Sequence, residues 1–287
     1  MDYHSDRFED FSLMVFKDEK LFAVLPANRK GNQLFSHQGL SYGSFVISKK
    51  TRIPDYFNAI SALLKWINAE GFLEINIKQL PFIYNKNIAE EFEYVLGEID
   101  YNIVANNSYY VLDNLKEYKP NRNRARGIKK AQKQMELVDS GMDYFWKNIL
   151  IKNLKNKFGV KPVHTYSEIA SLQAKFPNEI KFYAAKEGTA LHAGVVLFIT
   201  KNVVHFQYSS GKEDRDETGA LDFLFDVIIK KYSNYKYISF GSAATDDTLK
   251  IDSGLAYWKE SFGAYLMPQR TYAIKTSSGI NLEAAFK

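Results

Sequence analysis

The stretch HFQYSSGKEDRDETGALDFLFDVIIKKY, residues 205–232, contains three kinds of sequence in one line. It begins as a strand, passes through a polar loop and ends as an amphipathic helix. In that helix Leu221, Leu224, Phe225 and Ile228 recur at helical spacing and mark one apolar face. A strand that feeds a helix start through a small polar loop leaves backbone N–H groups unpaired, and the helix dipole adds partial positive charge. The junction therefore favours an anion such as phosphate.

Small residues stand on both sides of this junction. Gly219 would let a ligand approach the backbone closely, and Thr218 is placed to cap the helix. An ordinary strand-to-helix turn with a capping threonine has the same appearance, so both interpretations stay open. The residues that we expect to hold the phosphates are Ser209, Ser210, Gly211, Thr218, Gly219 and Ala220.

The same order of elements occurs twice along the chain. Each half runs from a hairpin to a strand, a glycine-containing loop, an amphipathic helix and another strand. The first hairpin turns at residues 18–20 and the second near 186–188, and the first helix spans 53–71. This repeat predicts two α/β domains, residues 1–135 and 136–287, each with a mixed, mostly antiparallel sheet flanked by helices.

Composition narrows the function classes. Of 287 residues, 46% are hydrophobic and 25% are charged, which is typical of a globular protein. The net charge of +5 suits phosphate-bearing substrates but is too small to indicate DNA binding. Cysteine is absent, which excludes disulfides and thiolate chemistry, and the five histidines lack metal-ligand spacing, so no metal is expected. Without a signal sequence or a run of membrane-spanning length, we expect a cytoplasmic protein.

A basic segment, KPNRNRARGIKKAQKQ, lies between the halves at residues 119–134. Pro120 and Asn121 predict a helix start there. One interpretation is a solvated connector helix. The other is a phosphate-binding surface, because arginines such as Arg122, Arg124 and Arg126 make bidentate phosphate contacts that lysines cannot.

The elements after residue 205 resemble the Gcn5-related N-acetyltransferase (GNAT) fold, in which this loop and helix start bind the pyrophosphate of coenzyme A. Of the usual Gln/Arg-x-x-Gly-x-Gly/Ala loop, Gly219 and Ala220 match the end. Nearly the whole chain resembles the tandem-GNAT, FemAB-like acyltransferases. Two segments carry that resemblance: RARGIKKAQK, with Arg124, Ile128, Lys130 and Ala131 matched, and GLAYWKESFG at 254–263, with Lys259 and Gly263 matched and Trp258 in place of the usual Phe.

Two more segments, FGVKPVHTYSEIASL at 158–172 and SHQGLSYGS at 36–44, resemble a bacterial branch associated with surface-polysaccharide synthesis. The resemblance implies an N-acyltransferase that moves an acyl group from a coenzyme A thioester to the amine of a nucleotide-linked, dTDP-type amino sugar. A FemX-like enzyme that uses aminoacyl-tRNA is one alternative. A non-catalytic module that binds a glycan or a partner protein is the other.

Residues near the junction are candidates for the chemistry. By resemblance Lys259 lies at the reaction centre, where its ammonium would polarise the acyl carbonyl. Strand alternation places His205 and Gln207 on one face and Tyr208 on the other, with His205 as a base and the strand as acceptor pocket. A half-buried strand with satisfied polar groups explains the same residues. Ser242, Thr245 and Asp246 follow the next strand, and either a substrate amine or a plain turn accounts for them.

The first half has its own polar loop at the equivalent position, and it differs in character. Ser36, His37 and Tyr42 stand where a phosphate cradle would need small residues. We expect this loop to bind the nucleotide or sugar of the acceptor, with Arg124 pairing the diphosphate.

Overall fold

The computed structural model describes residues 5–48, 51–87, 89–114, 116–213, 215–244, 250–278 and 282. The chain forms two compact units. Unit 1 comprises Met1–Asn107 with Gln269–Lys287, and unit 2 comprises Ser108–Pro268. We describe each unit by itself.

This division differs from the predicted boundary between residues 135 and 136 for two reasons. Strands β8 (Tyr101–Asp113) and β14 (Tyr265–Lys275) each begin in one unit and end in the other. Helix α3 (Arg122–Ala131), expected to end the first domain, packs its buried Ile128 and Ala131 into the core of unit 2. Neither feature has a signature in composition.

The sheet of unit 2 runs in the order β8-β13-β12-β11-β10-β9. Strands β12 and β13 pair in parallel, and the other described pairs in this unit are antiparallel. The sheet is therefore mixed and mostly antiparallel, as predicted. The bounds of the strands that follow β8 are β9 Glu136–Val138, β10 Ile180–Glu187, β11 Ala190–Ile199, β12 Val203–Gly211 and β13 Tyr237–Ser242.

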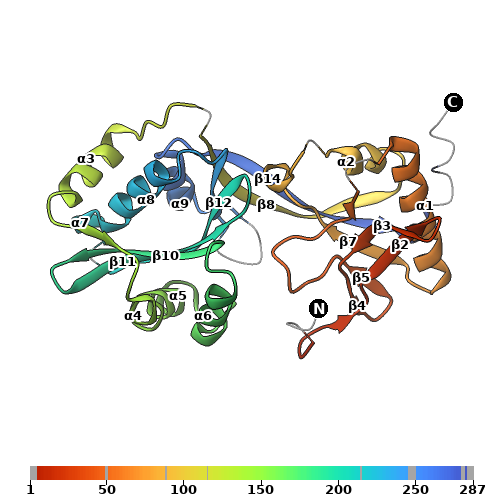
Figure 1. Ribbon diagram of the computed structural model, residues 1–287, viewed down its shortest axis with the longest axis horizontal. Coiled ribbons are helices and arrows are strands. Elements are labelled where there is room, and N and C mark those ends of the chain that lie inside the picture. Colours follow the sequence, from red (N-terminus) through yellow and green to blue (C-terminus); the bar gives the residue numbers. More distant parts are fainter. Residues whose placement is uncertain are drawn as a thin grey trace. The chain divides into compact units, whose positions relative to one another are not determined.

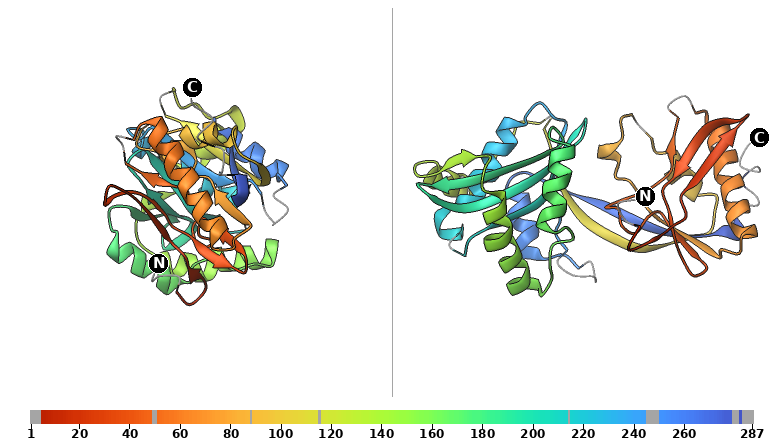
Figure 2. Two further views of the ribbon diagram at one scale, coloured as in Figure 1. Left: turned by 90° about the vertical axis from the view of Figure 1, so that its right-hand side faces the viewer. Right: turned by 60° about the horizontal axis from the view of Figure 1, so that its bottom comes forward.

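Helices cover both faces of this sheet (Figures 1 and 2). On one face lie α3, α8 (Ala220–Lys231) and α9 (Ser253–Glu260), with the short α7 (Arg215–Thr218) before α8. On the other lie α4 (Met142–Phe145), the π-helical turn η3 (Trp146–Leu150), α5 (Ile151–Phe158) and α6 (Tyr166–Lys175). We call these the α8 face and the α6 face.

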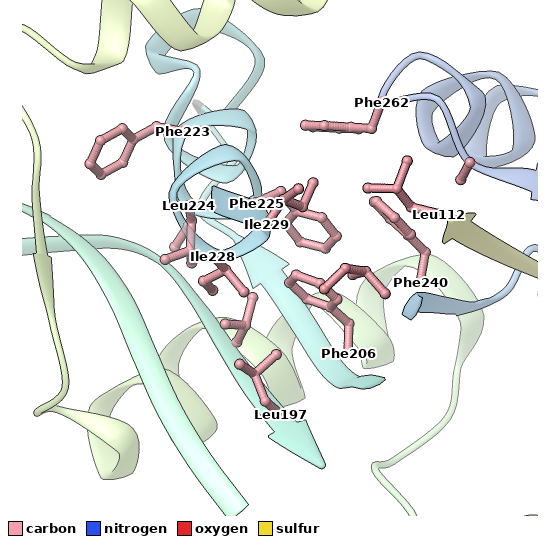
Figure 3. Close-up of a cluster of buried hydrophobic side chains, with 14 of the residues drawn as sticks. Leu112, Leu197, Phe206, Phe223, Leu224, Phe225, Ile228, Ile229, Phe240 and Phe262 are labelled. Carbon is pink, nitrogen blue, oxygen red and sulfur yellow. The ribbon is translucent and has the colours of Figure 1, made fainter. Parts of the chain in front are cut away.

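The core under α8 follows the predicted helical pattern. Leu224, Phe225 and Ile228 are buried, and Leu221 packs against them. Figure 3 shows the aromatic part of this core, where Phe225 stacks on Phe206 of β12 with ring centroids 3.9 Å apart. Apolar residues spaced every 3.6 positions form one side of a helix that must be covered by other apolar residues. In unit 2 the sheet covers this side of α8, so the pattern determines which side of the helix packs on the sheet.

Helices α4 to α6 were not predicted as elements, although α6 carries a local signal. The side chain of Thr165 accepts a hydrogen bond from Glu168 N, and the Glu168 carboxylate accepts one from Thr165 N, which is a complete capping box. The Thr-x-x-Glu spacing could have located the start of α6 from sequence.

Unit 1 repeats the arrangement on a smaller scale. Its strands run in the order β1-β4-β5-β7-β14. Strands β5 and β7 pair in parallel, and helix α1 (Ile53–Ala69) lies between them in the sequence. The predicted hairpin forms a separate small sheet from β2 (Leu13–Lys17), β3 (Lys20–Leu25) and β6 (Val46–Ile47). The remaining bounds are β1 Glu9–Asp10, β4 Asn28–Lys30, β5 Gln33–Phe35, β7 Glu74–Lys78, the 3-10 turn η2 Phe82–Tyr84 and α2 Glu91–Leu96.

Candidate active site

The parallel strands β12 and β13 of unit 2 pair over three residue pairs and then diverge. We call the place where they diverge the parting. Their pairing ends with His205 opposite Ser239, and among the described residues 206–211 and 240–242 the two strands pair no further. On the α8 face the parting is filled by aromatic rings, since Phe206 and Phe240 lie 5.6 Å apart and both contact Phe225 (Figure 3). A reacting group would therefore approach the parting from the α6 face.

A bulge in β12 decides which side chains reach that face. Leu197 pairs with Phe206 and Val196 pairs with Tyr208, so Gln207 is an extra residue in β12. Strict alternation would have put Tyr208 opposite to His205. Instead Tyr208 packs against Trp146, with ring centroids 4.8 Å apart, so it shares the α6 face with His205. The predicted placement of Tyr208 was wrong because a bulge shifts every following side chain by one position.

Lys259 lies at the end of β13. Its side chain comes from α9 and is 3% exposed, and Nζ donates hydrogen bonds to the carbonyls of Gly241, at 3.0 Å, and Ser242. Burial lowers the pKa of Lys259 to about 7. A lysine with this pKa exchanges its proton near neutral pH, so it can donate to an oxyanion or take up a proton.

His205 lies beside Lys259 at the same glycine. A Cβ built on Gly241 would lie 3.7 Å from His205 Cε1. His205 Nδ1 is 2.9 Å from Ser239 Oγ, and its ring stacks against Tyr109 of β8. Burial, together with the nearby charge of Lys259, lowers the pKa of His205 to about 4. The imidazole is thus neutral at physiological pH and a weaker base than predicted.

The remaining residues predicted near β13 divide into two groups. Ser242 Oγ accepts a hydrogen bond from Ala244 N at 2.9 Å, as a turn would require. Thr245 and Asp246 lie outside the described residues. Tyr109 and Ser239 were not selected from the sequence, and no local pattern distinguishes them from other strand residues.

The predicted phosphate cradle is occupied by the protein itself. Ser209, Ser210 and Gly211 belong to β12 and pair with β11 rather than forming a loop. The amide of Asn153, on α5, donates to Ser210 Oγ at 2.7 Å and to the Gly211 carbonyl at 2.6 Å. These three residues therefore serve the sheet, which corrects their assignment to a loop.

The start of α8 is closed by α3. Gly219 has a φ of +69°, and a Cβ there would lie 2.6 Å from the Gly127 carbonyl oxygen of α3. Glycine is thus needed for helix packing instead of ligand approach, and Ala220 is fully buried. Thr218 ends α7, and its hydroxyl accepts a long hydrogen bond of 3.4 Å from the N–H of Ala220, the first residue of α8, although the N-cap residue itself is Gly219.

Arg124 is engaged within unit 2. Its Nη1 lies 2.5 Å from Asp222 Oδ1 on α8, and its Nε donates to Ser261 Oγ at 2.9 Å. Trp258, on α9, donates its indole N–H to the same carboxylate at 3.0 Å. Asp222, which the sequence did not suggest, therefore joins the two segments that carry the family resemblance.

The outer surface of α3 remains basic. Asn121 caps the helix by accepting from Arg124 N, as the predicted helix start requires. No acidic residue lies within α3, since its sequence is RNRARGIKKA. The exposed cations on this helix and just after it are Arg122, Arg126, Lys129, Lys130 and Lys133.

The polar loop of unit 1 crosses the end of its parallel strands. Ser36 Oγ accepts from Lys78 N at 2.8 Å, and Gly43 N donates to the Lys78 carbonyl at 2.8 Å. His37 is buried with a φ of +51°, and Tyr42 lies against Tyr84 with centroids 4.7 Å apart. Ser36 and His37 thus hold the loop in place, while Tyr42 stays half-buried beside it.

Each unit is a GNAT-type α/β domain, and the chain is a tandem of two. That arrangement is the FemAB-like tandem GNAT fold. The chain is similar to the crystal structure of FemX, with a TM-score of 0.63 and 12% identity over 94% of this chain and 89% of that chain.

Two lysylphosphatidylglycerol synthetase structures are also similar. One is the C-terminal domain of a putative enzyme from Agrobacterium fabrum, with a TM-score of 0.58 and 12% identity over 96% of this chain and 88% of that chain. The other is L-PGS from Bacillus licheniformis, with a TM-score of 0.56 and 11% identity over 95% and 88%. No family model matches the sequence, and no curated protein matches it either. No helix in the described part of the chain is long and apolar enough to cross a membrane.

Proposed function

We propose that this chain is an acyltransferase that moves an acyl group from an activated carboxyl donor to an amine, at the parting of β12 and β13. The observation that carries the proposal is Lys259, whose buried Nζ lies at the end of β13 and has its pKa lowered to about 7. A buried lysine with few protein partners for its charge is costly unless the charge is used.

The chemistry is direct transfer. The neutral amine of the acceptor attacks the donor carbonyl, and the C–N bond forms as the carbonyl electrons move to oxygen. Lys259 in its ammonium form and the N–H groups at the open edge of β12 stabilise that oxyanion. The oxyanion then collapses, the bond to the donor's sulfur or oxygen breaks, and the proton that the attacking nitrogen loses is balanced by one that the leaving group gains.

Two donors fit this chemistry. A coenzyme A thioester is the donor implied by the GNAT resemblance, and it needs no metal. An aminoacyl ester of tRNA is the second candidate. The packing of Gly127 over Gly219 favours tRNA, because it covers the helix start that would hold a pyrophosphate. The basic outer surface of α3 supports the same choice, since it suits a phosphate backbone.

We propose that the acceptor is the amine of a nucleotide-linked amino sugar; in unit 1, taken by itself, the polar loop has the character of a nucleotide- or sugar-binding loop. Tyr42 is half-buried and presents an aromatic ring on which a base or sugar can stack. Within this loop, the exposed Gln38 is held by two hydrogen bonds to the buried Asn28.

The test is a transfer assay with two donors. The purified protein is incubated with dTDP-linked amino sugars and either acetyl-CoA or tRNA charged with radiolabelled amino acids, and the amide product is identified by mass spectrometry. We expect amide formation with one donor, lost in Lys259→Met and kept in Lys201→Met, a lysine exposed in a turn. Absence of amide with both donors, in the presence of sugar binding, would instead support a non-catalytic binding module.

A further inference from the structure

Helix α9, which carries Lys259, is held by side chains of two other helices. Trp258, the residue before Lys259, donates its indole N–H to Asp222 of α8 at 3.0 Å. Ser261, directly after the helix, accepts a hydrogen bond from Arg124 Nε of α3 at 2.9 Å and donates its own hydroxyl to the Trp258 carbonyl at 2.5 Å. Residues on both sides of Lys259 are therefore anchored outside α9.

These anchoring contacts meet at Asp222. Arg124 Nη1 lies 2.5 Å from Oδ1 and 2.6 Å from Oδ2 of this carboxylate. The two side chains are only 17% and 14% exposed, so water and salt screen this ion pair less than a surface pair. The guanidinium carbon also lies 5.8 and 5.6 Å from the ring centroids of Trp258 and Phe262. One carboxylate thus orients both the indole and the guanidinium that pack at the end of α9.

Helix α3 is fitted to this carboxylate. A Cβ built on Gly127 would lie 2.8 Å from Asp222 Oδ2, so a larger residue there would push the carboxylate aside. At the start of the same helix, the backbone N–H of Asn121 donates to the Ser261 carbonyl at 2.8 Å. The carboxylate is therefore enclosed between α3 and α9.

We infer that Asp222 is a positioning residue for the proposed acyl transfer and acts by fixing the place of Lys259. The inference rests on the role that we propose for Lys259. By holding Trp258, the carboxylate holds the turn of α9 that directs Lys259 Nζ to two carbonyls at the end of β13. In the described part of the chain no hydrogen bond or ion pair joins Asp222 to Lys259, so its effect passes through the helix.

The pKa of Lys259 distinguishes positioning from two other effects of losing the carboxylate. Burial lowers this pKa to about 7, so a shift of α9 that exposes the amine would raise the pKa towards its ordinary value of 10.5. Loss of a nearby negative charge acts in the opposite direction, because it disfavours the ammonium. A purely structural role would lower stability and leave the pKa unchanged. Every variant below retains the titratable groups around Lys259, which are His205 of β12, Tyr110 of β8 and the exposed Glu260 of α9.

The experiment titrates Lys259 in the full chain without substrate. The protein is made with lysine labelled with 13C at Cε, and the Lys259 signal is identified in NMR spectra by its absence from Lys259→Met. Asp222→Asn removes the charge and keeps the size of the side chain. Asp226→Asn is the matched control, since this buried carboxylate lies one turn later on α8. Its hydrogen bonds run to Tyr118 and Lys230, neither of which belongs to α9.

Gly127→Ala is the second test variant. It leaves Asp222 in the chain but displaces the carboxylate, while alanine favours the helical state of α3. If Asp222→Asn does not fold, Gly127→Ala decides by the same measurement.

We expect the pKa of Lys259 to rise by about one unit or more in Asp222→Asn, to rise by less in Gly127→Ala, and to change by less than about 0.3 in Asp226→Asn. In the transfer assay, the fall of kcat that follows deprotonation of Lys259 should move to higher pH by the same amount. An unchanged or lowered pKa in Asp222→Asn, or an equal rise in Asp226→Asn, overturns the positioning role. A wild-type protein that forms no amide with either donor overturns the proposed function, and the two failures are distinct because the pKa is measured without substrate.

Discussion

Units 1 and 2 contain the same pair of parallel strands joined by a helix, but the partings of the two pairs are filled differently. In unit 1 the chain's own loop closes the parting, because Ser36 Oγ and Gly43 N take up the backbone groups of Lys78. In unit 2 the corresponding carbonyls of β13 bond the buried amine of Lys259. The parting of unit 1 is closed by hydrogen bonds of its own loop, and that of unit 2 contains the titratable side chain of Lys259. This difference is the reason why we propose that the chemistry takes place in unit 2.

The comparison is tested most strongly by removing the amine of unit 2. Lys259→Met keeps the length of the side chain and deletes its charge. We expect kcat to fall by about two to three decades, as for loss of one oxyanion donor. Steady-state kinetics measures the loss, and circular dichroism checks that the variant is folded. A fall of less than about threefold in a folded protein would remove Lys259 from the mechanism.

Gly219→Val tests whether the start of α8 is a packing contact. Its Cβ would clash with the Gly127 carbonyl, in addition to the backbone strain at a φ of +69°. Gly159→Val is the matched control, because Gly159 has a φ of +66° and no atom within 4 Å of a built Cβ. We expect both variants to lose stability through strain, and Gly219→Val to lose about 1–3 kcal/mol more through overpacking. Urea denaturation gives both values; equal losses would mean that α3 does not close the site.

Gly43→Ala tests whether the loop of unit 1 closes the parting of β5 and β7. A Cβ at Gly43 would lie 2.4 Å from the Ser36 carbonyl oxygen, so the loop must move away from β7. We expect a loss of about 1–2 kcal/mol in the free energy of unfolding. Gly97→Ala, directly after the last residue of α2 and in a right-handed helical conformation, should be neutral or slightly stabilising. A loss no larger than that of Gly97→Ala would show that the loop does not seal the parting.

The pH dependence of stability should differ between wild type and Lys259→Met. Burial lowers the folded-state pKa of Lys259 to about 7, below the unfolded value of 10.5. Between these values the unfolded state binds more protons, so the stability of the wild type rises with pH across that window. From pH 7.5 to 8.5 we expect Lys259→Met to lack about 1 kcal/mol of this rise. Identical slopes in urea titrations would mean that Lys259 is not desolvated.

Periodicity predicted the order of strands and helices in each half, and the helical spacing of Leu224, Phe225 and Ile228 predicted the buried face of α8. The GNAT type of the two domains came from the family resemblance, while α4 to α6 and the boundary between the units were not predicted. The candidate site was harder to predict because it depends on departures from periodicity. The Gln207 bulge, which moves Tyr208 to the other face, leaves no mark in a single sequence.

Glycine was ambiguous for a related reason. Gly219 was interpreted as space for a ligand, while the structure uses the same space for Gly127 of α3, about 90 residues earlier in the chain. A glycine permits a close approach to the backbone, but the sequence does not show whether the approaching atom belongs to a ligand or to the protein. The partner of Arg124 was missed in the same way, because Asp222 becomes its neighbour through the packing of α3 on α8.

The exchange of β8 and β14 between the units sets an order for synthesis on the ribosome. Unit 2 is continuous in sequence, so all of its strands have been made by residue 268. Unit 1 begins first but lacks β14, which pairs with β7 from Thr271 to Lys275. The β7 edge can therefore be paired only after residues 271–275 have been made, although unit 1 contains the first residues of the chain. N-terminal domains ordinarily fold first during translation, but here the sheet of unit 1 is completed by a strand that follows all of unit 2.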